Sequence, residues 1–325
     1  MKQTFDIHDT EPLLLLGIND QHLQMLSESF DTTLVARGGA IIIEGKQRAV
    51  QRVAQVLGEM IISINRNGAL SLDDVKTLAQ VVGEGEPVEI DPGKIVVLYS
   101  HRGEVGPRSA GQRNFCEAAV DHDIVFAVGP AGTGKTYLAV AMAIAALKAK
   151  QVDRIILTRP AVEAGENLGF LPGDLKEKVD PYLTPLYDAL DAMLPAEKLR
   201  SYLSQRIIEI APLAYMRGRT LSSAYVILDE AQNATALQMK MFLTRLGANS
   251  RSIITGDITQ IDLPHNQSSG LIEAIEILRG IDGIAFCPLT AQDVMRHRLV
   301  KDILKAYQDN GDRPGGSQHD SHTSQ

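Results

Sequence analysis

The stretch with the most distinctive chemistry combines three glycines with a lysine and two threonines. Residues 129–136 read Gly-Pro-Ala-Gly-Thr-Gly-Lys-Thr, which matches the phosphate-binding pattern of a glycine, four residues and then Gly-Lys-Ser/Thr. Glycines let the backbone curl until successive N–H groups point at one anion. In this pattern Lys135 is expected to reach the β- and γ-phosphates of a nucleotide and act in catalysis, and the Thr136 hydroxyl to bind Mg²⁺. The predicted nucleotide-binding residues are Gly129, Pro130, Ala131, Gly132, Thr133, Gly134, Lys135 and Thr136.

The residues on both sides of this stretch favour a loop between a strand and a helix. Residues 124–128 are a short apolar run rich in β-branched and aromatic side chains, which indicates a buried parallel strand. Residues 135–148 are rich in Ala, Leu and Met and contain no Pro or Gly, which predicts a helix. The N-terminus of that helix would add N–H donors for the same anion. A glycine-rich turn that matches the pattern by chance is the alternative, and both flanks argue against it.

A second apolar run ends in two carboxylates. Residues 225–228 are Tyr-Val-Ile-Leu, and Asp229 and Glu230 follow them directly. In ATPases with a phosphate loop, an aspartate at such a strand end holds the Mg²⁺ shell. Glu230, one residue further, is positioned to polarise the attacking water. An ordinary loop start is the alternative, which becomes improbable once a phosphate loop precedes the run.

A third strand-like run, residues 252–255, enters the polar turn Gly-Asp-Ile-Thr-Gln at 256–260. An amide such as that of Gln260 can donate to a γ-phosphate oxygen and accept from water. It could therefore take part in hydrolysis and report it to the rest of the protein. A plain β-turn is the alternative.

These segments together resemble the PhoH family of phosphate-starvation-inducible ATPases. The similarity is carried by the loop at 129–136, by Leu-Asp-Glu-Ala-Gln-Asn at 228–233 and by the 256–260 turn. Matching segments also occur at 159–163, 168–173 and 215–220, and the match runs through residues 105–307. The resemblance implies a RecA-like core, ATP and Mg²⁺ as ligands, hydrolysis of the β–γ anhydride, assembly of copies into a ring, and a role in RNA metabolism.

The resemblance also suggests roles for individual side chains outside the main motifs. Gln112 resembles the helicase-type glutamine that reads adenine, with a solvated residue at a helix start as the alternative. Arg217 and Arg219 lie close enough to the acidic strand to touch phosphate, or else they face solvent. Arg296 matches a family arginine and is expected to act as an arginine finger. Family members often have Pro where this chain has Arg298, so it stays open which of the two arginines acts.

The first part of the chain indicates a small α+β unit. We expect a strand at 13–16, a helix at 21–30 with Asp20 as its N-cap, strands at 33–37 and 40–44 joined by Gly38-Gly39, and helices at 46–62 and 73–82. This order resembles the KH fold, whose nucleic-acid-binding loop would fall at 17–20. There Asp20 replaces the second glycine, and residues 1–82 hold ten acidic against seven Lys and Arg side chains. RNA binding and a docking role therefore both stay open.

Four segments are expected along the chain. They are a KH-like domain at 1–82, a linker with one strand (95–99) at 83–108, an ATPase domain at 109–308 and a disordered tail at 309–325. Within the ATPase domain, a first helix at 109–120 and further strands at 154–158, 207–210 and 284–287 alternate with helical stretches, which predicts a parallel sheet covered on both faces. The ligand should bind at the carboxyl ends of its strands.

Composition narrows the class of protein. The 325 residues carry a net charge of −8, which argues against a protein coated for DNA binding. No apolar run approaches the roughly 20 residues of a membrane span, and the start lacks a signal-peptide layout, so a cytoplasmic protein without membrane partners is expected. Cys116 and Cys287, the only cysteines, lie far apart in the chain and fit no metal or redox spacing.

Two functions remain after these observations. The leading hypothesis is a Mg²⁺-dependent ATPase whose hydrolysis cycle drives work on RNA, with helicase activity as one form of that work. The alternative is a nucleotide-controlled scaffold that docks an endoribonuclease or a ribosome-maturation factor and unwinds nothing itself. Stimulation of hydrolysis by RNA would separate the two.

Overall fold

The computed structural model describes residues 1–7, 10–84, 95–160, 175–264 and 266–295, together with Leu299 and Ile303; at 84 and 175–180 it describes the backbone alone. The expected tail at 309–325 and the segment at 168–173 lie outside these residues. Within the described part of the chain, no helix is both long and apolar enough to cross a membrane. The proposed domain boundaries stay predictions.

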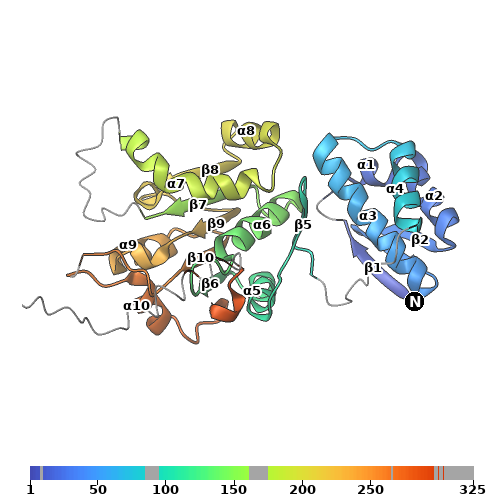
Figure 1. Cartoon of the computed structure of the whole chain (residues 1–325). Coiled ribbons are helices and arrows are strands. Elements are labelled where there is room, and N and C mark those ends of the chain that lie inside the picture. The colour runs from blue at the N-terminus through green and yellow to red at the C-terminus, as the bar shows by residue number, and fades with distance from the viewer. Residues whose placement is uncertain are drawn as a thin grey trace, which may run out of the picture.

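A six-stranded sheet whose hydrogen-bonded neighbours are all parallel forms the frame of the larger unit (Figure 1). The strands are connected in the spatial order β11-β6-β10-β9-β7-β8. One strand, β10, therefore separates the strand that precedes the phosphate loop from the strand that ends in the carboxylate pair, as in RecA-like cores. The strands are β6 (Ile124–Val128), β7 (Arg154–Arg159), β8 (Ile208–Pro212), β9 (Ala224–Leu228), β10 (Arg251–Gly256) and β11 (Ile284–Pro288).

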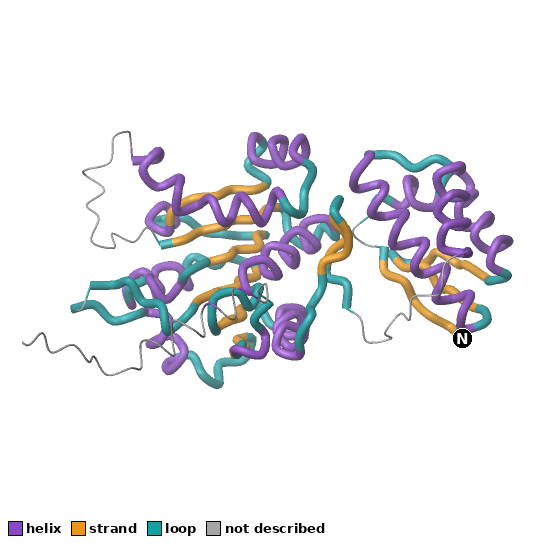
Figure 2. The backbone as a smooth tube through the Cα atoms, in the orientation of Figure 1, coloured by secondary structure: helices purple, strands orange, loops and turns teal. Residues whose placement is uncertain are grey.

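Helices cover both faces of this sheet (Figure 2). Alternate residues of β6 point to opposite faces, so Val125 and Ala127 join one core and Phe126 joins the other. The first core is completed by α5 (Ala110–Asp121), α6 (Lys135–Lys148), α7 (Leu175–Asp191) and α8 (Ala196–Ser204). The second is completed by α9 (Ala236–Leu243), α10 (Gly270–Ile277) and the 3-10 turns η3 (Leu213–Met216) and η4 (Ala231–Asn233). The predicted α/β architecture is confirmed.

The N-terminal unit is a three-stranded antiparallel sheet in the order β1-β3-β2, with helices packed on it. Its elements are β1 (Lys2–Asp6), α1 (Pro12–Leu16), η1 (Ile18–Asp20), α2 (Gln21–Phe30), β2 (Thr33–Arg37), β3 (Ala40–Glu44), α3 (Gln47–Asn67) and α4 (Leu72–Glu84). The predicted β2–β3 hairpin is confirmed, and both of its turn glycines, Gly38 and Gly39, have positive φ. The likeness to the KH fold stays a prediction.

One expectation about this unit is wrong, and a second is confirmed in position only. Residues 13–16 lie in helix α1 and not in a strand, because Pro12 occupies the first helical position and leucine is a strong helix former. The first strand is instead β1, an edge strand with a single buried side chain, Phe5, so its pattern is weak. Asp20 stands at the N-cap of α2, but its backbone is left-handed and its side chain makes no capping hydrogen bond.

A short hairpin connects the two units. The expected strand at 95–99 is observed only as β4 (Leu98–Ser100), which pairs with β5 (Gly103–Val105). The carbonyl of Tyr99 accepts hydrogen bonds from Asn65 of α3 at 2.7 Å and from Lys148 of α6 at 3.2 Å. The helix that begins at the phosphate loop therefore ends against this hairpin.

Both cysteines lie in the first core, and neither is in a disulfide. Burial, with the neighbouring Glu117 carboxylate as a smaller cause, raises the pKa of the Cys116 thiol to about 12. Burial also raises the pKa of the Cys287 thiol. Both side chains are therefore thiols, not thiolates, near neutral pH.

Candidate nucleotide-binding site

The predicted phosphate loop lies between β6 and α6, at the carboxyl ends of the strands. Gly132 and Gly134 have φ values of 84° and 75°, in the left-handed region that glycine adopts without strain. Gly129 passes so close to the residue after β11 that a Cβ there would lie 2.3 Å from the carbonyl oxygen of Leu289. These three positions of the loop thus need glycine for conformation or for space.

Side chains from separate motifs line one cavity beside this loop. The cavity has a volume of about 270 Å³ and is lined by loop residues with Lys135 and Thr136. Asp229 and Glu230, from the end of β9, and Gln260, from the turn after β10, complete the wall. The sheet order accounts for this arrangement, because β6, β10 and β9 are neighbours whose carboxyl ends meet at one edge.

Lys135 is folded back over its own loop. Its ammonium group donates to the carbonyl oxygens of Gly129 at 2.6 Å and of Pro130 at 2.9 Å. The side chain is 9% exposed, so the charge is held in a nearly buried position by these carbonyls. A nucleotide phosphate would compete with both carbonyls for the same ammonium group.

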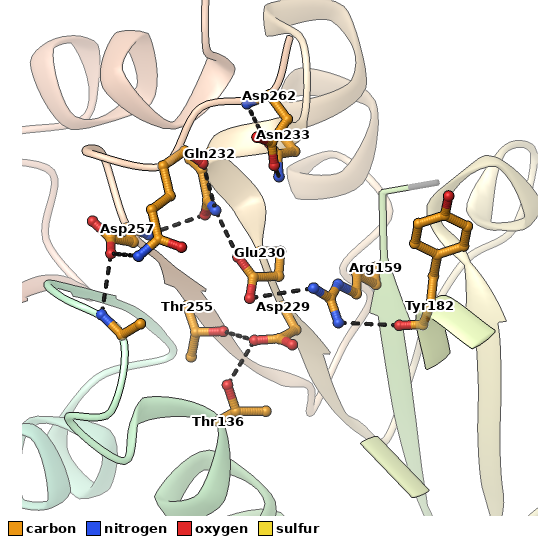
Figure 3. A network of polar contacts seen from close by, with 12 residues as sticks. Thr136, Arg159, Tyr182, Asp229, Glu230, Gln232, Asn233, Thr255, Asp257 and Asp262 are labelled. Atoms are coloured by element: carbon orange, nitrogen blue, oxygen red, sulfur yellow. Dashed lines mark hydrogen bonds and ion pairs between the residues drawn. The ribbon is translucent and has the colours of Figure 1, made fainter. Parts of the chain in front are cut away.

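The carboxylate of Asp229 accepts two hydroxyl hydrogen bonds (Figure 3). Thr136 donates to its Oδ1 at 2.7 Å, and Thr255 of β10 donates to the same atom at 2.6 Å. Asp229 is 3% exposed. Hydroxyl and carboxylate oxygens are the hard ligands that Mg²⁺ prefers, and Mg²⁺ in phosphate sites takes few protein ligands and keeps waters and phosphate oxygens. The residues present therefore fit a Mg²⁺–phosphate complex at Thr136 and Asp229.

Glu230 is held from two sides (Figure 3). Its Oε1 lies 3.3 Å from an amino group of Arg159, and its Oε2 accepts from the side-chain amide of Gln232 at 2.6 Å. Its backbone is left-handed, with φ of 51°, which turns the chain sharply out of β9. The carboxylate thus has a defined position at the wall of the cavity.

Asp257 links the turn after β10 to the phosphate loop. Its Oδ2 accepts from the backbone N–H of Ala131 at 3.1 Å and from the side-chain amide of Gln260 at 2.8 Å. Its own N–H donates to Gln232 at 3.0 Å, and Gln232 donates to the carbonyl of Gln260 at 3.1 Å. The loop, the turn and the segment after Glu230 therefore form one hydrogen-bonded network.

Thr255, Asp257, Gln232 and Arg159 were not predicted as site residues. Each lies within or next to a segment that resembles the PhoH family, and this position in the sequence could have marked it as a candidate site residue. The alternative interpretation of residues 256–260 was a plain β-turn. A plain β-turn does not account for the hydrogen bond between this turn and the phosphate loop. The catalytic role of Gln260 stays a prediction.

The sequence of this chain is similar to those of several known proteins. The family model described as PhoH-like protein matches residues 104–308. The chain belongs to the PhoH-like protein family. A PhoH-like protein of Bacillus subtilis is 49% identical over 299 residues, which cover 91% of this chain and 94% of that protein. One of Mycobacterium tuberculosis is 48% identical over 311 residues, covering 94% and 88%. Protein PhoH of Escherichia coli is 48% identical over 202 residues, covering 62% and 57%.

A solved structure gives a more distant similarity. The Sulfolobus solfataricus SWI2/SNF2 ATPase core in complex with dsDNA is similar to 47% of this chain and 32% of its own, with 18% identity and a TM-score of 0.31.

Gln112 of this PhoH-like protein is buried, so the alternative of a solvated side chain at a helix start is wrong. Its amide nitrogen donates to the carbonyl of Thr133 at 2.9 Å, and its amide oxygen accepts from the N–H of Arg108 at 2.7 Å. A Cβ at Gly134 would lie 3.1 Å from the same amide nitrogen. Gln112 therefore supports the phosphate loop from its neighbouring helix, and adenine recognition by it stays a prediction.

A carboxylate connects the turn after β11 to the N-terminus of α5. Asp293, in the turn η5 (Ala291–Asp293), accepts from the Ser109 hydroxyl at 2.6 Å and from the N–H groups of Gly111 at 3.1 Å and Thr290 at 2.7 Å. These hydrogen bonds, the one from Ser109 foremost, lower the pKa of Asp293. A Cβ at Gly111 would lie 2.6 Å from the carboxylate oxygens, so the contact requires glycine there.

The predicted finger arginine, Arg296, lies outside the described residues, as does Arg298. The residue before Arg296 is described: the N–H of Met295 donates to the carbonyl of Gly132 in the phosphate loop at 2.9 Å. The chain therefore runs directly past the phosphate loop immediately before Arg296.

The two arginines before β9 do not contribute to this cavity. Arg219 forms a two-pronged ion pair with Glu209 of β8, both contacts at 2.7 Å. The pair lowers the pKa of Glu209 and raises that of Arg219. Arg217 is exposed. Of the two arginines, Arg219 therefore has its guanidinium paired with a carboxylate of β8.

Proposed function

We propose that this protein is a Mg²⁺-dependent ATPase that hydrolyses the β–γ anhydride of ATP in the cytoplasm and couples the reaction to work on RNA. The observation that carries the proposal is the contact of 2.7 Å between the hydroxyl of Thr136 and the carboxylate of Asp229, with Glu230 on the same cavity. A metal site and a water-activating carboxylate thus adjoin a phosphate loop. Membership in the PhoH-like family supports the same proposed function.

Each side chain has a distinct task in the proposed reaction. The loop N–H groups and Lys135 would bind the phosphates, and Thr136 with Asp229 would hold Mg²⁺, which would supply positive charge against the charge developing on the transferred phosphoryl group. Glu230 accepts a proton from the attacking water at its carboxylate. The side-chain amide of Gln260 donates to Asp257, which accepts from the loop as well, and from that position the amide would donate to a γ-phosphate oxygen.

The direct test is phosphate release from Mg²⁺–ATP by the parent protein and by Lys135→Ala. Loss of a phosphate clamp of this kind removes several kcal/mol of transition-state stabilisation, so turnover by Lys135→Ala should fall to background. Lys240→Ala, which removes an exposed lysine from helix α9, serves as the matched control and should keep the parental rate. Parental activity in folded Lys135→Ala would refute the ATPase proposal.

The alternative, a nucleotide-controlled scaffold for an endoribonuclease or a ribosome-maturation factor, is favoured by the loop at 17–20. Asp20 places a carboxylate where a nucleic-acid phosphate would approach, and Ile18 beside it is 68% exposed. Leu13 of α1 is 63% exposed. Apolar side chains around an acidic residue suit a protein partner better than RNA.

RNA-stimulated hydrolysis separates the two functions. The ATPase rate is measured against added single-stranded RNA at two salt concentrations, with assembly mass recorded in parallel. Stimulation that weakens at higher salt supports coupling to RNA, because phosphate contacts are screened. A rate unchanged by RNA supports the scaffold.

A further inference from the structure

Arg159 connects the acidic pair to helix α7. It is the last residue of β7, whose Thr158 carbonyl accepts from the N–H of Asp229 at 2.9 Å. One amino group of its guanidinium lies 3.3 Å from Glu230, and the other donates to the carbonyl of Tyr182 in α7 at 3.1 Å (Figure 3). A guanidinium is planar and rigid, so anchoring one amino group fixes the direction of the other. The orientation of Glu230 is therefore tied to α7.

Arg159 approaches Glu230 from a second cavity. This cavity of about 410 Å³ is lined by Arg159 and Asp188, and it shares Thr136, Tyr137, Asp229 and Glu230 with the cavity of the phosphate loop. Arg159 is absent from the lining of the phosphate-loop cavity. Its guanidinium is held between the Glu230 carboxylate and the Tyr182 carbonyl.

Among the residues that the structure describes, Arg159 and Gln232 hold one oxygen each of the Glu230 carboxylate, and both are themselves anchored. Gln232 is bonded to Asp257 and Gln260, and Arg159 to Tyr182. The side chains of Arg159 and Glu230 are 21% and 36% exposed, so the ion pair is partly shielded from solvent. A general base must approach one water molecule from a defined direction. Two anchored partners restrict the orientation of the Glu230 carboxylate, and misplacement of a reacting group by about 1 Å can lower the rate by about 10²-fold.

We propose that Arg159 is a positioning residue that holds Glu230 in line with the attacking water. The inference rests on the proposed ATPase function and adds to it a residue that acts only through Glu230. Removing Arg159 should lower kcat, because the carboxylate loses one of its two holds, and should leave the affinity for ATP unchanged. An arginine that bound phosphate would instead weaken ATP binding when removed.

The test is a double-mutant cycle over the parent, Arg159→Ala, Glu230→Gln and the double variant. Single-turnover hydrolysis of labelled Mg²⁺–ATP gives the rate, and titration with a fluorescent ATP analogue gives Kd. We expect Arg159→Ala to lower the rate about tenfold or more with Kd within about twofold, and to cause no further loss in the Glu230→Gln background. Arg159→Lys keeps the charge without the fork and should recover part of the rate.

Arg154→Ala is the matched control, because Arg154 lies at the opposite end of β7 and donates to the carbonyl of Ser222. It should hydrolyse ATP at the parental rate. If Arg159→Ala does not fold, Arg159→Gln takes its place in the cycle. Equal fold-losses from Arg159 substitution in both backgrounds, or a raised Kd with an unchanged rate, would overturn the positioning role alone. A parent no faster than Lys135→Ala would overturn the proposed ATPase function and this inference with it.

Discussion

The hydroxyl of Thr136 and the carboxylate of Asp229 lie 2.7 Å apart, although one begins helix α6 and the other ends strand β9. The contact exists because β10 alone separates the strands that lead to them. On the same carboxylate oxygen, Thr255 of β10 donates at 2.6 Å. Oδ1 of Asp229, the residue after β9, thus accepts hydrogen bonds from Thr136 at the start of α6 and from Thr255 of β10.

This relationship predicts how the metal requirement responds to mutation. Asp229→Asn removes the charge that would bind Mg²⁺, and Thr255→Val removes only a hydroxyl that orients that charge. Both should raise the Mg²⁺ concentration needed for half-maximal hydrolysis, Asp229→Asn the more strongly, since loss of a ligand's hydrogen-bond partner commonly lowers metal affinity or activity about 10–100-fold. Mg²⁺ titration at fixed ATP measures the effect, and an unchanged requirement in both variants would place the metal elsewhere.

A second prediction separates binding from chemistry at Glu230. Glu230→Gln keeps the shape of the side chain but cannot accept a proton, so hydrolysis should fall by about 10²–10⁴-fold while ATP still binds. Single-turnover rates and ATP titration measure the two effects. Glu276→Gln, an exposed position on α10, is the control and should behave as the parent. Hydrolysis at the parental rate by Glu230→Gln would assign water activation to another group.

A third prediction concerns the pH dependence of stability through Asp293. Its pKa is lowered in the folded protein, so its stabilising effect is complete above the ordinary aspartate pKa of 3.8 and is lost as pH falls through the folded value. Asp293→Asn should lower the free energy of unfolding by about 1–3 kcal/mol at pH 7, because a charged acceptor of several hydrogen bonds is removed. The difference from the parent should shrink below about pH 4.

Denaturant unfolding between pH 3 and pH 7 measures this effect. Asp153→Asn, at an exposed position before β7, is the control and should change stability by no more than about 0.5 kcal/mol. A difference between parent and Asp293→Asn that stays constant over the whole pH range would show that the carboxylate charge is not the stabilising feature.

The fourth prediction is that Arg296 acts across a subunit boundary of the ring assembly that the PhoH resemblance implies. The N–H of Met295 donates to the carbonyl of Gly132, so the chain passes directly beside the phosphate loop just before Arg296. An arginine finger from a neighbouring copy contributes roughly 10³–10⁵ in rate. Activity per subunit should therefore rise steeply with protein concentration, and Arg296→Ala should be inactive.

Mixing tests whether this finger works in trans. Arg296→Ala and Lys135→Ala, each inactive alone, should regain part of the activity together, because some interfaces then join an intact loop to an intact finger. Mass measurement must show that the two variants co-assemble. Absence of rescue in such mixtures would contradict a trans finger at Arg296, and a parallel mixture with Arg298→Ala would show whether Arg298 acts instead.

The sequence by itself determined the elements and motifs whose signals are local. The phosphate loop was predictable because glycines, Lys135 and Thr136 must stand at a defined spacing for one anion to meet them. The carboxylate pair was predictable because an apolar run that ends in Asp229 and Glu230 indicates a buried strand reaching a polar edge. The sheet strands were predictable for the same reason, since fully buried parallel strands read as short continuous apolar runs.

The tertiary structure alone decided the partners of those residues. Nothing local marks Thr255 as a hydrogen-bond donor to Asp229 or Arg159 as a partner of Glu230, because both contacts depend on which strands are neighbours in the sheet. The burial of Gln112 likewise follows from where α5 packs. The four leucines at 13–16 form a helix that Pro12 at its first position favours, and the tertiary structure shows which of them, Leu15, is buried in the N-terminal core. Local chemistry therefore identified the reacting groups, and long-range packing set their geometry.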